Sequence, residues 1–188
     1  MNCINTDSNT VFDEVLDMSN VYGISRNNKH IEWEKNSENE GSPVESMLIE
    51  FCKNDSISSS EVICLFHVTS PFINLKTIEQ ASKYLNDGYD SVQSVKRIQD
   101  FVFKMEDEKM IPVNYDPFKV QRTQDILPVY MSLGAFFIST KQKILEEGKR
   151  LPGKVFNYEL DSVSSIEIDY PDDLQLARYV ASNMVEYD

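Results

Sequence analysis

The sequence predicts a single α/β domain whose sheet is mostly parallel. Two observations indicate this class: short apolar segments alternate with segments of helical periodicity, and 188 residues is about the length of one domain. The hydrophobic fraction of 41% is sufficient for one core. Strands that alternate with helices favour parallel pairing through right-handed crossovers.

The clearest predicted strand covers residues 62–68, a continuous apolar run that ends at Thr69, Ser70 and Pro71. A run of this length, bounded by turn residues, is typical of a strand buried on both faces. Four shorter segments are also predicted as strands, at residues 2–5, 90–95, 134–139 and 164–169.

Helices are predicted at residues 43–53, 76–86 and 141–147, and from Pro171 onward. The first follows Ser42 as a cap, and in the second Ile78, Ala81 and Leu85 share one stripe. The last carries two aspartates in its first turn, where the helix dipole favours carboxylates. Its predicted buried stripe is Leu174, Ala177, Val180, Ala181 and Met184.

Two stretches interrupt the alternation. Residues 24–42 are polar, contain the only Trp, and are predicted to form a loop over the carboxyl edge of the sheet. Residues 101–130 hold two apolar segments around an acidic turn and then a Pro-containing passage, which predicts a hairpin and arm inserted between two core strands. A long insertion in a compact domain is usually functional.

The net charge of the chain restricts the classes of partner that it can bind. Eighteen basic and 31 acidic residues give a net charge of −13, which disfavours a nucleic-acid backbone because its binding depends on Lys and Arg. A small anionic ligand remains compatible, since a few local cations or a metal outweigh the distant field. The sequence shows neither an apolar run of membrane-spanning length nor a signal peptide, and it predicts a cytoplasmic protein without a membrane partner.

The three cysteines, Cys3, Cys52 and Cys64, are predicted to be reduced thiols. Their number is odd, and their spacing matches no metal site. Cys64 falls inside the apolar run of residues 62–68, so it is predicted to lie in the core.

Three segments carry a resemblance to a known family. In chain order they are His67-Val-Thr-Ser-Pro71, then Gln121-Arg-Thr-Gln-Asp-Ile-Leu-Pro128 leading into Gly134-Ala-Phe-Phe-Ile138, and finally Ser165-Ile-Glu-Ile-Asp-Tyr-Pro-Asp-Asp-Leu174. With this order and spacing, essentially the whole chain resembles an N-terminally truncated acylneuraminate cytidylyltransferase (CMP-sialic acid synthetase).

The resemblance implies a three-layer Rossmann-like nucleotidyltransferase sheet with a dimerisation hairpin or arm at residues 101–130. It also implies a homodimer and transfer of a cytidylyl group from CTP to the anomeric hydroxyl of a nonulosonic acid. Pyrophosphate is released, and Mg²⁺ assists the reaction.

The resemblance also implies roles for single residues. Asp169 is the expected catalytic Mg²⁺ ligand, with Glu167 as a second carboxylate that faces the same side if this segment is a strand. The alternative is that Asp169 only starts the last helix. Lys104 and Arg122 on the arm are expected catalytic cations that serve the partner's site, or else solvated charges. The expected substrate-binding residues are His67, Thr69, Ser70, Gly134 and Phe137.

Thr6 and Asp7 match a turn that is common in the family. Their alternative role, as the cap of a helix over residues 9–19, is favoured by their residue types.

Some positions depart from the family pattern. His67 replaces a glutamine, Phe137 a tyrosine, and Met131 and Leu133 stand where many members have Arg and Asn. A site made for hydrogen bonds accommodates apolar replacements poorly, which favours an acceptor other than N-acetylneuraminate.

The family pattern also begins with a strand that runs into a Pro-Ala-Arg-x-Gly-Ser-Lys loop around the nucleotide phosphates, whereas residues 2–5 match its second strand. Residues 1–188 hold six glycines and no glycine-rich turn after a strand. We therefore expect negligible cytidylyltransferase activity from these residues alone.

Whether this chain is itself an enzyme stays open at this point. One alternative is a non-catalytic homologue that retains a dimer or sugar-binding surface. Another is a generic α/β binding domain.

Overall fold

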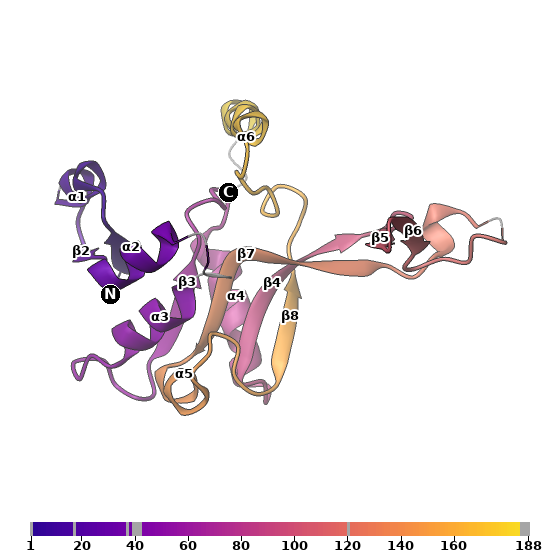
Figure 1. Ribbon diagram of the computed structural model, residues 1–188. Helices are drawn as coiled ribbons and strands as arrows, with labels where there is room; N and C mark the ends of the chain where they lie inside the picture. Colours follow the sequence, from indigo (N-terminus) through magenta and orange to yellow (C-terminus); the bar gives the residue numbers. More distant parts are fainter. Residues whose placement is uncertain (1, 17, 37, 39–42, 120, 185–188) are drawn as a thin grey trace. The chain divides into compact units, whose positions relative to one another are not determined.

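The computed structural model describes residues 2–16, 18–36, 38, 43–119 and 121–184 (Figure 1). Contacts between residues divide the chain into two compact units, Met1–Lys53 and Asn54–Asp188. Each unit is described separately below, and the single domain expected from the sequence stays a prediction.

The first unit contains a two-stranded parallel sheet. Strand β1 (Asn2–Thr6) pairs with β2 (Val21–Ser25), and helix α1 (Asn9–Leu16) connects them. Ser8, rather than Thr6 or Asp7, begins this helix, because its hydroxyl accepts the Val11 N–H at 3.4 Å.

Two further helices complete the first unit. The prediction of a loop over residues 24–42 is wrong in its described part, because β2 ends at Ser25 and helix α2 (Asn28–Lys35) follows. Because α2 is polar in composition, its sequence shows no clear helical periodicity. The side chain of Asn27 caps the helix by accepting the Lys29 N–H, and His30 is its buried residue. The predicted helix at residues 43–53 is confirmed as α3 (Val44–Cys52), whereas Ser42 lies outside the described residues.

The second unit is built on a four-stranded sheet in the order β3-β7-β4-β8. Strands β3 (Val62–Phe66), β4 (Ser91–Ile98) and β7 (Val129–Thr140) confirm three predicted strands, and β8 (Val155–Glu159) was not predicted. The sheet is not mostly parallel: β7 is antiparallel to both β3 and β4, and only β4 and β8 are parallel.

The strand predicted at residues 164–169 is not formed. The Asp161 carboxylate accepts the backbone N–H groups of Val163 and Ser164 and the Ser164 hydroxyl, which turns the chain instead. Residues 166–168 then run without regular structure, and the Ile168 N–H donates to the Thr69 carbonyl at 2.8 Å.

The core lies between the sheet and helix α4 (Leu75–Ser82), which is behind the sheet in the view of Figure 1. A 3₁₀ turn, Lys83–Leu85, extends α4. The predicted stripe is confirmed, since Ala81 is fully buried and Ile78 and Leu85 pack against the cluster. The buried members of the cluster are Ala81, Val92, Leu133, Ala135, Phe136, Ile138 and Leu160, and Cys64 also packs against it.

The remaining helices are α5 (Lys141–Glu147) and α6 (Pro171–Asn183), both at predicted positions. The buried stripe predicted for α6 is largely wrong, because only Ala177 is buried and Leu174, Ala181 and Met184 are exposed. No helix in the described part of the chain is long and apolar enough to cross a membrane.

The predicted hairpin is present between β4 and β7. Strands β5 (Phe103–Glu106) and β6 (Lys109–Pro112) pair antiparallel around a turn in which Asp107 and Glu108 have positive φ. In Figure 1 this hairpin and a 3₁₀ turn, Thr123–Asp125, lie beyond the long ends of β4 and β7, away from α5.

Candidate functional site

The second unit brings together parts of the three segments that carry the family resemblance. The turn after β3 contributes His67, Thr69 and Ser70, the middle of β7 contributes Gly134, and the chain before α6 contributes Glu167. We refer to these five residues as the β3-turn cluster. Residues that are far apart in the sequence therefore form one site at the carboxyl end of β3.

Glu167 is the centre of the β3-turn cluster. Its Oε1 accepts the Gly134 N–H at 3.0 Å and the Ser70 hydroxyl at 3.4 Å. The neighbouring Ile168 N–H holds the Thr69 carbonyl. These bonds fasten the chain before α6 to both β3 and β7, and they occupy one oxygen of the carboxylate.

Gly134 permits this close approach because it has no side chain. A Cβ at this position would lie 2.6 Å from His67 Nδ1 and 3.2 Å from Glu167 Oε1. Contacts under 3.0 Å require a neighbour to move, so a glycine is needed here for packing and not for φ. The local pairing of β4 and β7 is irregular between Gln93 and Val95, opposite this part of β7.

His67 is half-buried, and its ring lies 5.8 Å from the ring of Phe137. Burial lowers the pKa of His67, the positive charge of Arg150 lowers it further, and the carboxylate of Glu167 opposes both. The imidazole is therefore neutral near pH 7. Its buried Nε2 has no hydrogen-bond partner among the residues that the structure describes.

Arg150 was not predicted as a site residue. It follows α5 in a segment without any motif, and only the fold brings its guanidinium to 4.3 Å from the centre of the Phe137 ring. Phe137 itself is 5% exposed, so this predicted substrate residue is mostly covered. Leu133 belongs to the buried core, and Met131 is exposed on β7.

Asp169 lies two residues beyond Glu167 and is exposed. Because residues 166–169 are not a strand, the argument that both carboxylates share a face no longer applies. Asp169 does not cap α6: the N-cap is Tyr170, and the Asp173 carboxylate in the first turn accepts the N–H groups of Asp169 and Tyr170. The Asp169 carboxylate is thus not used by the helix that follows.

The described residues contain no group of three or more His, Cys, Asp or Glu side chains that could hold a metal ion. Mg²⁺ needs only one or two carboxylates when phosphate oxygens and water complete its coordination. The exposed Asp169 carboxylate is an oxygen ligand of the kind that such an ion takes.

The two predicted cations of the arm are not part of the β3-turn cluster. Lys104 Nζ lies 2.8 Å from Glu106, and the Arg122 guanidinium binds Asp125 through two bonds of 2.7 and 3.1 Å. Both side chains are largely exposed and lie on the arm. The ion pairs that these two cations make with Glu106 and Asp125 both lie within the arm.

Comparison with solved structures shows which class of fold this is. The chain superposes on 4-diphosphocytidyl-2C-methyl-D-erythritol synthase from Anaerococcus prevotii with a TM-score of 0.64 and 14% identity, over 94% of this chain and 78% of that one. It superposes on CMP:2-keto-3-deoxy-manno-octonic acid synthetase, solved with CTP, with a TM-score of 0.60 and 12% identity, over 97% and 81% of the two chains. The fold is the Rossmann-like nucleotidyltransferase fold of cytidylyltransferases.

Comparison with characterised sequences is more specific. The chain is 28% identical over 113 residues to N-acylneuraminate cytidylyltransferase of Streptococcus agalactiae serotype V, and 27% identical to that of serotype III. The aligned part is 58% of this chain and 27% of each relative. No family model matches the chain. The resemblance predicted from the sequence is thus confirmed, and the chain spans about a quarter of the length of the relatives it matches.

Proposed function

We propose that this protein is a cytidylyltransferase that transfers a cytidylyl group from CTP to a sialic-acid-like nonulosonic acid. The observation that carries the proposal is the convergence of the three family segments on Glu167. Its carboxylate accepts hydrogen bonds from the Gly134 N–H and the Ser70 hydroxyl, and the N–H of its neighbour Ile168 donates to the Thr69 carbonyl. Similarity to N-acylneuraminate cytidylyltransferases supports the acceptor class. A neighbour in fold that was solved with CTP supports the donor.

In the proposed reaction, the anomeric hydroxyl of the acceptor attacks the α-phosphorus of CTP. A new P–O bond forms to the sugar, the bond between the α-phosphorus and its bridging oxygen breaks, and pyrophosphate leaves with the electron pair. The attacking hydroxyl loses its proton to solvent water during this step. The chain's contribution is to position the hydroxyl and to stabilise the developing charge.

The β3-turn cluster suits the positioning role. The neutral imidazole of His67 offers Nε2, which lacks a protein partner among the described residues, to a hydroxyl or amide of a ligand. Ser70 and Glu167 hold the backbone of the turn and of β7 in place. Thr69 lies between His67 and Ser70 in the turn after β3.

Asp169, with Glu167 second, would hold Mg²⁺, which when bound neutralises negative charge on the phosphate oxygens. We predict that Asp169→Asn abolishes Mn²⁺ binding measured by paramagnetic relaxation in the presence of CTP, with the circular dichroism spectrum unchanged. Asp172→Asn removes a nearby exposed carboxylate and is the matched control. If Asp169→Asn titrates like the parent, Asp169 has only a structural role.

The activity itself is tested with CTP, Mg²⁺ and a panel of nonulosonic acids, by pyrophosphate release and by mass spectrometry of the CMP-sugar. We expect negligible turnover from residues 1–188 alone and turnover when a family-like first strand and phosphate loop is fused before Met1. A fused protein that binds CTP but turns over none of the acceptors contradicts the proposed acceptor class. A fused protein that does not bind CTP contradicts the proposal as a whole.

A further inference from the structure

The loop between α5 and β8 holds a cation beside the β3-turn cluster. Helix α5 ends at Gly148, which has φ of 65° and donates its N–H to the Ile144 carbonyl. Residues 149–154 then lead to β8 and carry Arg150. Hydrogen bonds and ion pairs at both ends of this loop fix the backbone that carries Arg150.

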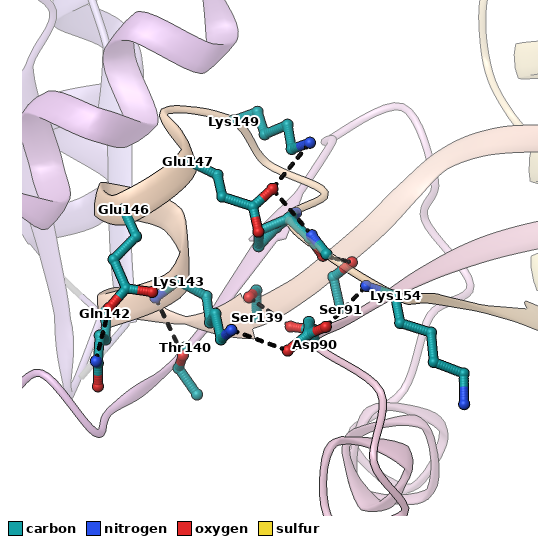
Figure 2. Close-up of polar contacts among 12 residues, drawn as sticks. Asp90, Ser91, Ser139, Thr140, Gln142, Lys143, Glu146, Glu147, Lys149 and Lys154 are labelled. Atoms are coloured by element: carbon teal, nitrogen blue, oxygen red, sulfur yellow. Dashed lines mark hydrogen bonds and ion pairs between the residues drawn. The ribbon is translucent and has the colours of Figure 1, made fainter.

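Several bonds fasten the loop to the start of β4 (Figure 2). The Asp90 carboxylate accepts the Lys154 N–H at 2.8 Å and lies 3.2 Å from Lys143 Nζ on α5. The Ser91 hydroxyl, fully buried, donates to the Pro152 carbonyl at 2.8 Å. The backbone hydrogen bond from Lys154, followed by the bond from Lys143, lowers the pKa of Asp90.

The other end of the loop is tied back to α5. Glu147 Oε2 accepts the Gly153 N–H at 3.1 Å and pairs with Lys149 Nζ at 2.9 Å. Pro152 has less than 2% of its surface exposed. A loop bonded on both sides of Arg150 is an anchored support, and a side chain on it loses less entropy when it binds a ligand.

The guanidinium of Arg150 lies over the ring of Phe137 on β7. Its guanidinium carbon lies 4.3 Å from the ring centre, a distance at which a cation and an aromatic face attract each other. The same ring lies beside His67 at 5.8 Å. Arg150 and His67 therefore both lie against the same buried aromatic side chain, Phe137.

The charge of Arg150 acts on the β3-turn cluster. It lowers the pKa of His67, after burial, which means that the cation and the imidazole interact electrostatically. The cation, the aromatic ring and the unpartnered buried Nε2 of His67 thus belong to one local surface. In a chain with a net charge of −13, such a local cation favours an anionic group against the overall field.

We propose that Arg150, supported by Phe137 and beside His67, binds the carboxylate of the acceptor and is a specificity-determining residue. This assignment rests on the proposed function, because it takes the acceptor to be a sugar acid. A guanidinium binds a carboxylate through two parallel hydrogen bonds, which gives both affinity and orientation. His67 Nε2 then pairs with a neighbouring polar group of the same acceptor.

The test measures acceptor binding without turnover. The probes are nonulosonic acids, N-acetylneuraminate among them, and their C1 methyl esters, and dissociation constants are measured by NMR titration of the parent, Arg150→Gln, Arg150→Lys and Lys83→Gln. Lys83→Gln removes a positive charge at an exposed position outside the residue 149–154 loop and is the matched control. A second readout, the pKa of His67 from imidazole NMR, reports whether Arg150 lies where the structure places it.

We expect the parent to bind the acid about tenfold or more tightly than the ester, and Arg150→Gln to bind both alike. Arg150→Lys should keep part of the preference, Lys83→Gln all of it, and the pKa of His67 should rise only in Arg150→Gln. A parent that prefers the acid and an Arg150→Gln variant that prefers it equally would overturn the assignment while the proposed function stands. A parent that binds none of the acids or esters would overturn the proposed acceptor class and this assignment with it.

Discussion

At the scale of single residues, the candidate site depends on one close approach. The backbone of β7 at Gly134 touches both His67 and Glu167, so the distance between these two groups is set by the lack of a side chain there. The family resemblance pointed to all three residues. That the Glu167 carboxylate accepts the Gly134 N–H is a property of the fold.

Gly134→Ala is predicted to disrupt the site. The new Cβ would lie 2.6 Å from His67 Nδ1, so His67 and Glu167 must move, at a cost of about 1–3 kcal/mol in the free energy of unfolding. We expect weakened acceptor binding and altered imidazole NMR signals of His67.

Gly88→Ala is the control for this variant. Gly88 has φ of 82° and open space around it, so alanine is strained there by about 1 kcal/mol or more without touching the cluster. Both variants are expected to unfold at lower denaturant concentration, but only Gly134→Ala should change the His67 signals. Unchanged signals in Gly134→Ala would count against the contact.

The pKa of His67 predicts a pH dependence of stability. Because its folded pKa is below the ordinary value of 6.5, the unfolded chain binds this proton at a higher pH than the folded protein does. The free energy of unfolding should therefore fall as pH drops below about 6.5, until pH reaches the folded pKa.

His67→Gln is expected to reduce this slope, measured by urea unfolding at pH 7.5, 6.5 and 5.5. His30→Gln removes the only other histidine and should leave the contribution of His67 in place. Equal slopes in the parent and His67→Gln would show that the imidazole is not perturbed by the fold.

At the scale of elements, the loop before β8 is the support on which Arg150 depends. Asp90 holds it through a backbone bond and an ion pair with Lys143, and Gly153 passes so close that a Cβ there would collide with Asp90. Since the folded pKa of Asp90 is lowered, its stabilisation is present above the ordinary pKa of 3.8 and is lost as pH falls through the lower folded value.

Asp90→Asn is predicted to loosen this loop. It removes the ion pair with Lys143 and weakens the acceptor for Lys154 N–H, so amide hydrogen exchange at Gly153 and Lys154 should be faster than in the parent. Asp87→Asn, at an exposed position in the turn before β4, should leave these rates unchanged. Exchange that is equal in both variants would mean that the loop is held by Glu147 and Ser91 alone.

At the scale of the whole molecule, the arm carries exposed apolar side chains. Its hairpin exposes Phe103, Met105 and Met110, at 43, 67 and 62%. Soluble monomers rarely expose contiguous apolar surface of this kind. Lys104 and Arg122 lie on the same arm and are proposed to serve the site of a second copy.

We predict a homodimer at micromolar concentration by sedimentation equilibrium, and a monomer after deletion of residues 101–118. Because a deletion can disturb folding, Met105→Glu with Met110→Glu is the second variant; these residues face each other across the hairpin. Leu176→Glu, at another exposed apolar position, should leave the mass unchanged. A parent that sediments as a monomer would remove the basis for a role of the arm in dimerisation.

Local pattern was enough to place most of the elements. The apolar run at residues 62–66, the Ala81 stripe of α4, the proline at the start of α6 and the acidic turn of the hairpin each carry their signal within a few residues. Helix α2 and strand β8 were missed because their composition is polar or mixed, and tertiary packing determines such segments. The strand expected before α6 failed because side-chain bonds from Asp161 satisfy the backbone locally.

The sequence by itself determined most of the segments that form elements, the α/β class and the residues that resemble the family. Only the tertiary structure decided that β7 lies antiparallel between β3 and β4, that Glu167 binds Gly134 and Ser70, and that Arg150 reaches Phe137. The physical reason is the separation along the sequence of the residues that interact. Helix periods, turns and caps depend on neighbours along the chain, whereas strand order, close backbone approach and the placement of a cation depend on residues tens of positions apart.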